Sequence, residues 1–304
     1  MWWQIKWAKN AALGALPAAE ALRRFKRRLR PYPTSVPQWT IEEGLRQTEL
    51  LREAGFPLRG AKILEIGTGW RPAVPLLFSL AGADRVVMGD SQRLMDPHTF
   101  LGTVRELAAQ AGSIAARLGL DEAKVRAELE DVPEDLSGLL HRFRLDYLAP
   151  CDVVSYPFKD GEFDVVTSRA VLEHVPPDVL RRILERSFQL VRPGGWTCHA
   201  VDNSDHWSHE DSRLSRVNFL RYSDSFFDYL NRFNPLDYQN RLRHPEYENL
   251  LRELGFEVVI SRSTPEPQVL ADLQSLPLAP RFQGFPPEDL ARLDSYFVAR
   301  RPAG

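Results

Sequence analysis

The sequence predicts an α/β fold, in which a mostly parallel sheet carries helices on both faces. The first observation is a series of short apolar runs typical of β-strands, each separated from the next by a stretch with helical periodicity. Strict alternation of strand and helix is typical of parallel sheets, because their crossover connections are helices. The second observation is that acidic residues and glycines stand at the ends of these runs, where α/β proteins bind ligands.

The composition describes a globular protein with an unusual first segment. The chain has 304 residues, of which 43% are hydrophobic, so it can bury a large core. Its net charge of −2 argues against nucleic acid as a partner. We divide the chain into a basic amphipathic arm at residues 1–37 and a main domain at residues 38–304. The arm has the pattern of a helix that lies on an anionic membrane or packs on its own protein, and we favour packing.

The cysteines and the hydropathy pattern predict where the protein resides. Cys151 and Cys198 fall in different predicted strands, which favours free thiols over a disulfide framework. No apolar run approaches the roughly 20 residues of a membrane span. We therefore expect a cytoplasmic protein, and the basic arm leaves open a peripheral contact with the inner membrane face.

The main domain is expected to begin with a helix, after which predicted strands alternate with predicted helices. Thr40 and Glu43 have the spacing of a capping box, and Gly55 is placed to end that helix. Strands are predicted at 62–67, 85–90, 146–150, 163–168 and 196–202, and helices at 72–80 and 178–191, the second stopped by "RPGG". The interval after Asp90 is too long for one crossover and is rich in helix formers, so about residues 92–145 are interpreted as an inserted helical cap.

The ends of the first two strands indicate a nucleoside-containing cofactor. Gly67 and Gly69 follow Glu65 and allow a ligand to approach the backbone. Asp90 ends the second strand, where a carboxylate can accept hydrogen bonds from both hydroxyls of a ribose. Arg71 stands where the pyrophosphate of NAD or FAD would profit from a third glycine, so S-adenosylmethionine is favoured, and an NAD enzyme stays an alternative.

At this point the chain resembles a known family, the class I S-adenosylmethionine-dependent methyltransferases. The similar stretches are "ILEIGTG", "VVMGDS", "CDVVSYPFKDGEFDVV", "SRAVLEHV" and "LVRPGGW", in the order of the family's motifs. The resemblance implies a Rossmann-like, seven-stranded, mostly parallel sheet, with "LLRELGFEVV" reaching the sixth strand and "RLDSYFVARRP" forming a last, antiparallel strand. Arg71 and the long insertion depart from the family pattern, and the insertion points to a specialised substrate lid.

The resemblance also implies which residues bind S-adenosylmethionine. They are Glu65, Gly67, Gly69 and Arg71 at the methionine part, Asp90 and Ser91 at the ribose, Asp152 and Val153 at the adenine, and Ser168 and Arg169 below the sulfonium. For Arg71, contact with the methionine carboxylate and capping of the following helix both stay open. Each acid alone could be a turn or capping residue, but three acids at successive strand ends favour a cofactor site.

The segment at about residues 203–245 is predicted to form the acceptor side of the site. His206 is the first candidate for the general base that a hydroxyl acceptor needs, and His174 of "LEHV" is the second; a purely structural role stays open for both. The further residues predicted to contact the acceptor are Asp202, His209, Asn240 and Arg241.

The predicted function is methyl transfer from S-adenosylmethionine to a small-molecule or sugar-containing acceptor, as an O-methylation in a biosynthetic pathway. An N-methyltransferase, or an inactive partner subunit that binds the cofactor, are the alternatives. A homodimer is left open. Asp202, Asp205, His206 and His209 are potential metal ligands, but their spacing implies no particular geometry, so no metal is predicted.

Overall fold

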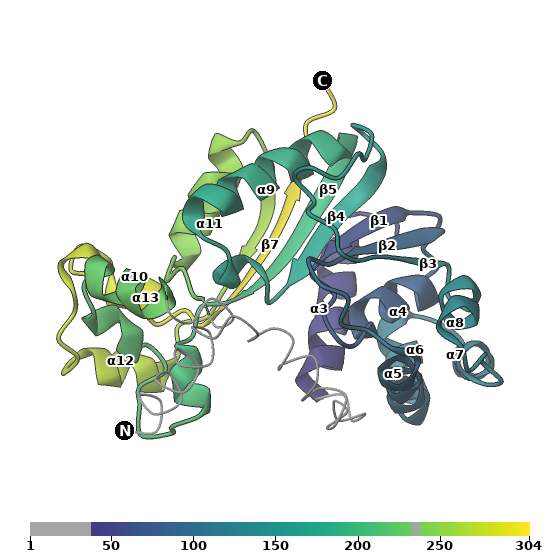
Figure 1. Cartoon of the computed structure of the whole chain (residues 1–304), viewed down its shortest axis with the longest axis horizontal. Coiled ribbons are helices and arrows are strands. Elements are labelled where there is room, and N and C mark those ends of the chain that lie inside the picture. Colours follow the sequence, from purple (N-terminus) through teal and green to yellow (C-terminus); the bar gives the residue numbers. More distant parts are fainter. Residues whose placement is uncertain (1–37, 233–237) are drawn as a thin grey trace, which may run out of the picture.

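The computed structural model describes residues 38–232 and 238–304, so the predicted arm at residues 1–37 lies outside the described residues. The centre of the fold is a seven-stranded sheet with the order β3-β2-β1-β4-β5-β7-β6. The first five strands pair in parallel, and β7 runs antiparallel to both of its neighbours. The predicted Rossmann-like sheet is therefore confirmed (Figure 1).

The strands follow the predicted runs closely. Their bounds are β1 (Lys62–Ile66), β2 (Arg85–Gly89), β3 (Leu145–Leu148), β4 (Phe163–Arg169), β5 (Val191–Asp202), β6 (Glu257–Arg262) and β7 (Asp294–Arg300). The fifth strand differs from its prediction, because it begins at Val191, directly after a helix. "RPGG" therefore lies within β5 and does not form a separate stop. A register shift between Phe163 and Val165 accommodates the additional residues of β5.

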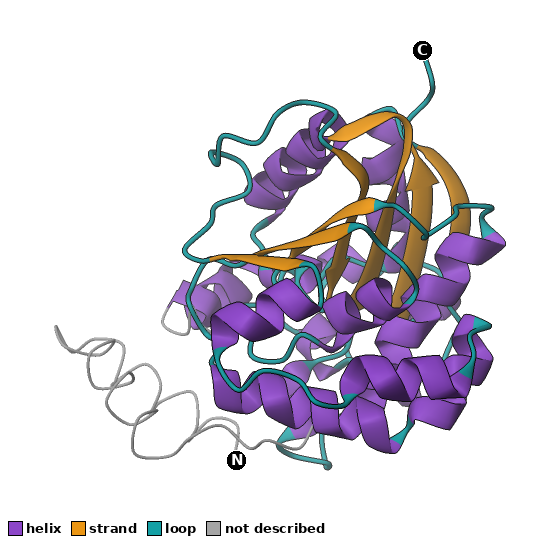
Figure 2. Ribbon diagram, turned by 90° about the vertical axis from the view of Figure 1, so that its right-hand side faces the viewer, coloured by secondary structure: helices purple, strands orange, loops and turns teal. Residues whose placement is uncertain are grey.

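Helices cover both faces of the sheet, as Figures 1 and 2 show. Successive strand residues point to opposite faces, so Ile63 packs in the core beneath α3 (Gln38–Glu53) and α4 (Ala73–Leu80). Leu64 packs instead in the cluster that includes side chains of α9 (Pro177–Leu190). The same side of the sheet carries α11 (His244–Glu253). In the described ranges, no helix combines the length and the hydropathy needed to cross a bilayer.

The first described helix corrects one prediction. Thr40 is the third residue of α3 and is buried, so it cannot be an N-cap. Glu43 accepts a hydrogen bond from the Tyr296 hydroxyl across 2.7 Å, which joins α3 to β7. The predicted capping box is therefore wrong. Gly55 does follow the end of the helix, with a φ of +86°.

The long interval after β2 forms four helices on one flank of the sheet. They are α5 (Pro97–Ala109), α6 (Ala111–Leu118), α7 (Glu122–Leu129) and α8 (Leu136–Arg142). Their apolar side chains belong to the same core cluster as those of α3 and α4, and the Phe100 and Phe143 rings stack 6.0 Å apart. The helices lie beside β2 and β3 (Figure 1) and contribute no residue to the cavity described below. They therefore do not line this cavity, as a substrate lid over it would.

A second apolar core lies at the other end of the molecule and joins two distant segments. It contains side chains from α10 (Asp224–Arg232), α12 (Pro267–Leu273) and α13 (Pro287–Leu290), which lie together at the left of Figure 1. Arg243 is fully buried and donates hydrogen bonds to the carbonyls of Asn203, Leu290 and Arg292. The segment after β5 therefore packs against residues that precede β7, and Arg243 is hydrogen-bonded to both segments.

The turn after β1 contains two glycines whose replacement by alanine should destabilise the fold to different extents. Gly67 has a φ of +77°, and a Cβ there would lie 2.5 Å from Cγ2 of Val171, whereas Gly69 has a φ of +72° with open space around it. We expect Gly69→Ala to lower the free energy of unfolding by about 1–2 kcal/mol, the cost of the left-handed conformation. Gly67→Ala should cost about 2–5 kcal/mol, because overpacking is added. Urea denaturation measures both, and equal costs would contradict the contact with Val171.

Candidate active site

One carboxylate joins the turn after β1 to the end of β2. Asp90 accepts hydrogen bonds from the Gly69 N–H at 2.8 Å and from the Gln92 N–H at 3.1 Å. Burial raises the pKa of Asp90, and these backbone donors oppose the rise. Ser91 is exposed beside it, and Arg71 is partly buried just before α4. Asp90 thus fixes the glycine turn, and its predicted contact with a ribose stays a prediction.

Glu65 is buried near the end of β1, and the partly buried Arg169 at the end of β4 is close enough to favour the charged form of Glu65. Burial raises the pKa of Glu65 to about 7, although the Thr68 hydroxyl donates to this carboxylate and Arg169 also favours its charged form. The Arg169 guanidinium lies 4.8 Å from the centre of the Trp39 ring. Its Nη1 is buried and has no hydrogen-bond partner among the residues that the structure describes. The two groups can therefore receive a ligand that carries both charges.

Three residues predicted to bind the cofactor have side chains that contact, or are buried among, other residues of the protein. The Ser168 hydroxyl is buried and lies 2.8 Å from Nδ1 of His199, so its predicted place below a sulfonium is not supported. The exposed Asp152 carboxylate accepts hydrogen bonds from the Val154 N–H and the Ser155 hydroxyl within its own turn. The Val153 side chain is buried in the core. The adenine contacts predicted for Asp152 and Val153 stay predictions.

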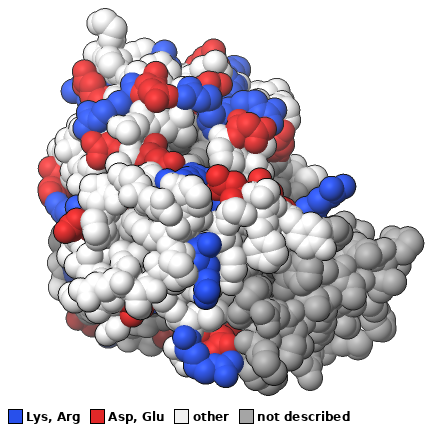
Figure 3. Space-filling view, turned by 90° about the vertical axis from the view of Figure 1, so that its left-hand side faces the viewer, with Lys and Arg blue, Asp and Glu red and all other residues white. Residues whose placement is uncertain are grey.

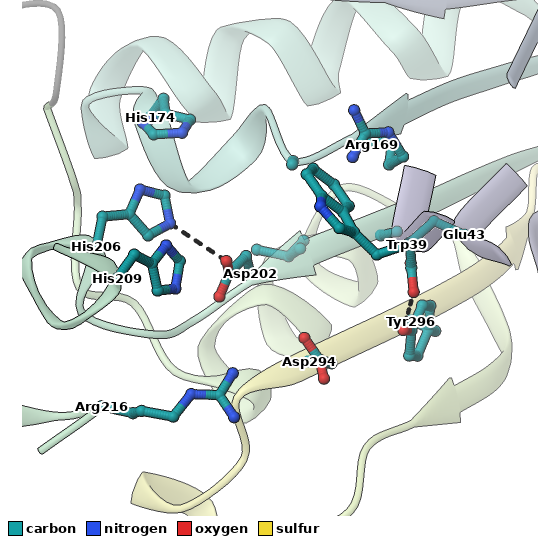
Figure 4. Close-up of a pocket in the computed structure, with 13 residues that line it drawn as sticks. Trp39, Glu43, Arg169, His174, Asp202, His206, His209, Arg216, Asp294 and Tyr296 are labelled. Carbon is teal, nitrogen blue, oxygen red and sulfur yellow. Dashed lines mark hydrogen bonds and ion pairs between the residues drawn. The ribbon is translucent and has the colours of Figure 1, made fainter. Parts of the chain in front are cut away.

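A cavity of about 550 Å³ opens at the carboxyl ends of β4 and β5 (Figure 4). Its lining comes from α3, β4, β5, β7 and the loop after β5, and consists of Trp39, Glu43, Arg169, Ala170, His174, Ala200, Val201, Asp202, His206, His209, Arg216, Asp294 and Tyr296. Arg169 therefore both lines this cavity and lies near Glu65. The predicted residues His174, Asp202, His206 and His209 are brought together in one wall.

That wall contains three histidine rings and one carboxylate. The ring centres of His174 and His206 are 4.9 Å apart, and those of His206 and His209 are 5.1 Å apart. Nε2 of His206 forms an ion pair with Oδ2 of Asp202 at 3.3 Å. Burial lowers the pKa of His206, but Asp202 and Glu173 outweigh it and the net shift is upward. Burial lowers the pKa of His209, whose Nε2 lies 3.0 Å from a serine hydroxyl.

Two residues predicted to contact the acceptor lie outside this cavity. The Asn240 side-chain amide donates to the carbonyl of Leu172 at 2.7 Å. The Arg241 guanidinium is buried, donates to the carbonyl of Phe219 at 2.9 Å and pairs with Asp224 at 2.6 Å. Both side chains hold neighbouring backbone in place, so the predicted contact with an acceptor is not supported.

The opposite wall contains residues that sequence analysis missed. Trp39 stands 57% exposed at the mouth, and burial raises the pKa of both Glu43 and Asp294. No local pattern marks these positions as functional, because each fits its helix or strand. Only the pairing of β5 with β7 sets Asp294 opposite Asp202.

Charged side chains of both signs are distributed over the molecular surface. On the face shown in Figure 3, blue and red side chains alternate in the upper part and uncharged residues dominate below. Phosphate backbones are bound by clustered Lys and Arg side chains. Among the described residues on this face, no continuous basic surface for a nucleic acid is seen (Figure 3).

The sheet order, with an antiparallel strand between the fifth and sixth strands, and the acids at the carboxyl ends of β1 and β2 define a class I S-adenosylmethionine-dependent methyltransferase. The chain belongs to the methyltransferase domain family, whose model matches residues 40–260. No curated protein matches it significantly in sequence.

Solved structures share the fold at low sequence identity. The 1,6-didemethyltoxoflavin-N1-methyltransferase of Burkholderia thailandensis is 20% identical, with 87% of this chain and 80% of that chain covered and a TM-score of 0.46. An S-adenosylmethionine-dependent methyltransferase of Mesorhizobium loti is 14% identical, with 83% and 96% covered and a TM-score of 0.46. Phosphoethanolamine N-methyltransferase 2 of Haemonchus contortus is 16% identical, with 84% and 52% covered and a TM-score of 0.47. These likenesses concern the fold alone.

The donor of this class, S-adenosylmethionine, is the cofactor of the chain. Its amino-acid part carries an ammonium and a carboxylate group. Glu65 complements the ammonium, and the buried Nη1 of Arg169 complements the carboxylate, although Arg169 was predicted to lie below the sulfonium. The place of Arg169 and the contact of Asp90 with the ribose hydroxyls stay predictions. The residues present therefore fit the cofactor.

Proposed function

We propose that the chain methylates an oxygen atom of a small-molecule acceptor bound in the cavity at the ends of β4 and β5, and that His206 takes the proton. The observation that carries this proposal is the His206–Asp202 ion pair in the cavity wall (Figure 4). The cofactor supplies an electrophilic methyl group, so the protein must position the nucleophile and accept its proton. Asp202 faces Nε2 of His206 and orients the ring, which leaves Nδ1 to accept the proton.

The cavity also supports a class of acceptor. Its volume of about 550 Å³ is within the usual range for small-molecule sites. Trp39 and Tyr296 offer aromatic surface, while Glu43 and Asp294 offer carboxyl groups that can bind hydroxyls. Aromatic faces combined with carboxyl groups suit a hydroxylated ring, so the acceptor is a sugar-containing or similarly hydroxylated compound.

The experiment that tests the proposal uses the full chain with S-adenosylmethionine whose methyl group carries an isotope label. Hydroxylated small molecules, glycosides among them, are offered as acceptors. Mass spectrometry follows S-adenosylhomocysteine and locates the labelled methyl group in the product. Methylation at nitrogen would overturn the choice of oxygen. Cofactor binding without any turnover across the panel would favour an inactive partner subunit.

The titration of Glu65 yields a prediction for cofactor affinity. The pKa of Glu65 is raised to about 7, so its carboxylate is populated above that pH and is lost below it. The ionised form attracts the cofactor's ammonium, so the affinity for S-adenosylmethionine should fall as the pH is lowered from 7.5 to 6, by up to about tenfold. Calorimetric titration at both pH values measures this change. Glu65→Gln should remove it, and a full pH dependence in that variant would assign the effect to another group.

Several wider expectations stay predictions. They are the cytoplasmic location, the formation of a homodimer, a membrane contact through residues 1–37, and a place in a biosynthetic pathway.

A further inference from the structure

Glu173, His174 and His206 form a cluster of potential metal ligands beside the cavity. A carboxylate oxygen of Glu173 and one ring nitrogen of each histidine all lie within 4.8 Å of one another. Glu173 and His174 belong to the 3-10 turn Leu172–His174 after β4, and His206 begins the turn His206–His209 after β5. Neighbouring parallel strands end at the same edge of the sheet, which brings these separate segments together.

Both imidazoles are already oriented by groups outside the cluster. Nδ1 of His174 lies 2.8 Å from the carbonyl oxygen of Tyr238, so this nitrogen is the donor and Nε2 keeps its lone pair. Nε2 of His206 faces Oδ2 of Asp202 at 3.3 Å, which leaves Nδ1. Metal-bound histidines nearly always donate their second nitrogen to a backbone carbonyl or a carboxylate. His174 follows this pattern through the Tyr238 carbonyl, and His206 is held by its ion pair with Asp202.

The third member is a buried acid, and burial raises the pKa of Glu173 to about 8. Glu173 is only 3% exposed, and its Oε2 has no hydrogen-bond partner among the described residues. Its Oε1 accepts one long hydrogen bond, at 3.3 Å, from the Asp202 N–H. An isolated buried carboxylate is costly, so such groups are protonated, paired or bound to metals. A cation at this place would offset the cost.

We propose that Glu173, His174 and His206 bind a divalent transition-metal ion of the Zn²⁺ or Co²⁺ type. Two imidazoles and one carboxylate are a common protein ligand set for such ions, and imidazole disfavours Mg²⁺. Bond lengths of about 2.0–2.2 Å place tetrahedral ligand atoms about 3.4 Å apart, so side-chain adjustments of about 1.5 Å or less close the site. Both histidines of the set also line the cavity.

A metal ion bound at this site would affect methyl transfer. This consequence rests on the proposed function, in which His206 is the base. The lone pair of His206 Nδ1 that accepts the acceptor's proton is the same lone pair that binds the ion. The ion and the proton therefore compete, and saturating Zn²⁺ lowers the rate of methyl transfer.

The test measures binding without cofactor or acceptor, so it does not depend on turnover. Untagged full-length protein is titrated with CoCl₂, and the ligand-field absorption of tetrahedral Co²⁺ is followed, with ZnCl₂ as competitor. One strong site per chain is expected. Glu173→Gln and His174→Asn keep the size of each side chain and should each weaken binding beyond the about 10–100-fold expected for an outer-shell partner such as Asp202→Asn.

Two controls make the assignment specific. His209→Asn removes the neighbouring ring, whose Nε2 bonds to Ser204, and should leave Co²⁺ affinity near that of the wild type. MgCl₂ should not displace Co²⁺. Absence of a Co²⁺ signal, or wild-type affinity in folded Glu173→Gln and His174→Asn, would overturn the site. Bound Co²⁺ in a protein that never methylates would support the site and refute only the proposed function.

Discussion

His206→Asn is expected to lower kcat by about 10²–10⁴-fold while affinity for S-adenosylmethionine stays near that of the wild type. Asparagine keeps a polar side chain at this position but cannot take a proton from a hydroxyl acceptor. The ring that it replaces lines the acceptor cavity, whereas the charges proposed to hold the cofactor are those of Glu65 and Arg169. Initial rates of S-adenosylhomocysteine formation give kcat, and calorimetry gives the affinity.

Two further variants separate the base from its surroundings. Asp202→Asn removes the ion pair that orients His206 and should reduce kcat by a smaller factor. His209→Asn changes the adjacent ring, 5.1 Å from that of His206, and should have the smallest effect of the three. If His206→Asn lost cofactor affinity as strongly as turnover, the role of His206 would be structural.

Arg243→Met is expected to lower the free energy of unfolding by about 2–5 kcal/mol, since three buried carbonyl groups lose their donor. Arg243 donates to the carbonyls of Asn203, Leu290 and Arg292 at 2.8, 3.0 and 2.9 Å. Methionine fills much of the same space without any donor. Relief of the buried charge offsets part of the cost, because burial already lowers the pKa of Arg243 to about 10. Urea denaturation monitored by circular dichroism measures the change.

Arg281→Met is the matched control for this experiment. Arg281 lies in the same part of the fold, but its side chain is 28% exposed and pairs with Glu246 at 3.1 Å. Such an ion pair contributes about 0–1 kcal/mol. Equal destabilisation by the two variants would show that Arg243 is no special link between the loop after β5 and the segment before β7.

Most of the sheet could be predicted because its signals are local. Apolar runs such as 85–90 recur with helical stretches between them, and the continuous burial of β1 and β2 is what parallel strands covered on both faces produce. The predictions that were wrong concern the residues at which helices and strands begin or end. Nothing local distinguishes "RPGG" as a helix stop from "RPGG" as the start of β5, and Thr40 has the residue type of a cap although α3 already includes Gln38.

The predicted site was right in part, for a similar reason. Glu65 lies near the end of β1, Gly69 lies in the turn after β1, and Asp90 directly follows β2, so the strand ends alone place them together. Asn240 and Arg241 looked equally suitable as polar residues among aromatics, yet both are used to hold backbone carbonyls. A polar side chain in a loop gives no local sign of whether it faces a cavity or a carbonyl group.

By itself, the sequence determined the order of strands and helices, the glycine turn with its acids, and the family. These features depend on periodicity and on residues close together along the chain. Only the tertiary structure decided that α5–α8 flank the sheet, that β7 sets Asp294 opposite Asp202, and that Glu173 and His174 meet His206. The physical reason is that such contacts depend on which strand lies beside which, and β-sheet pairing joins residues far apart in sequence.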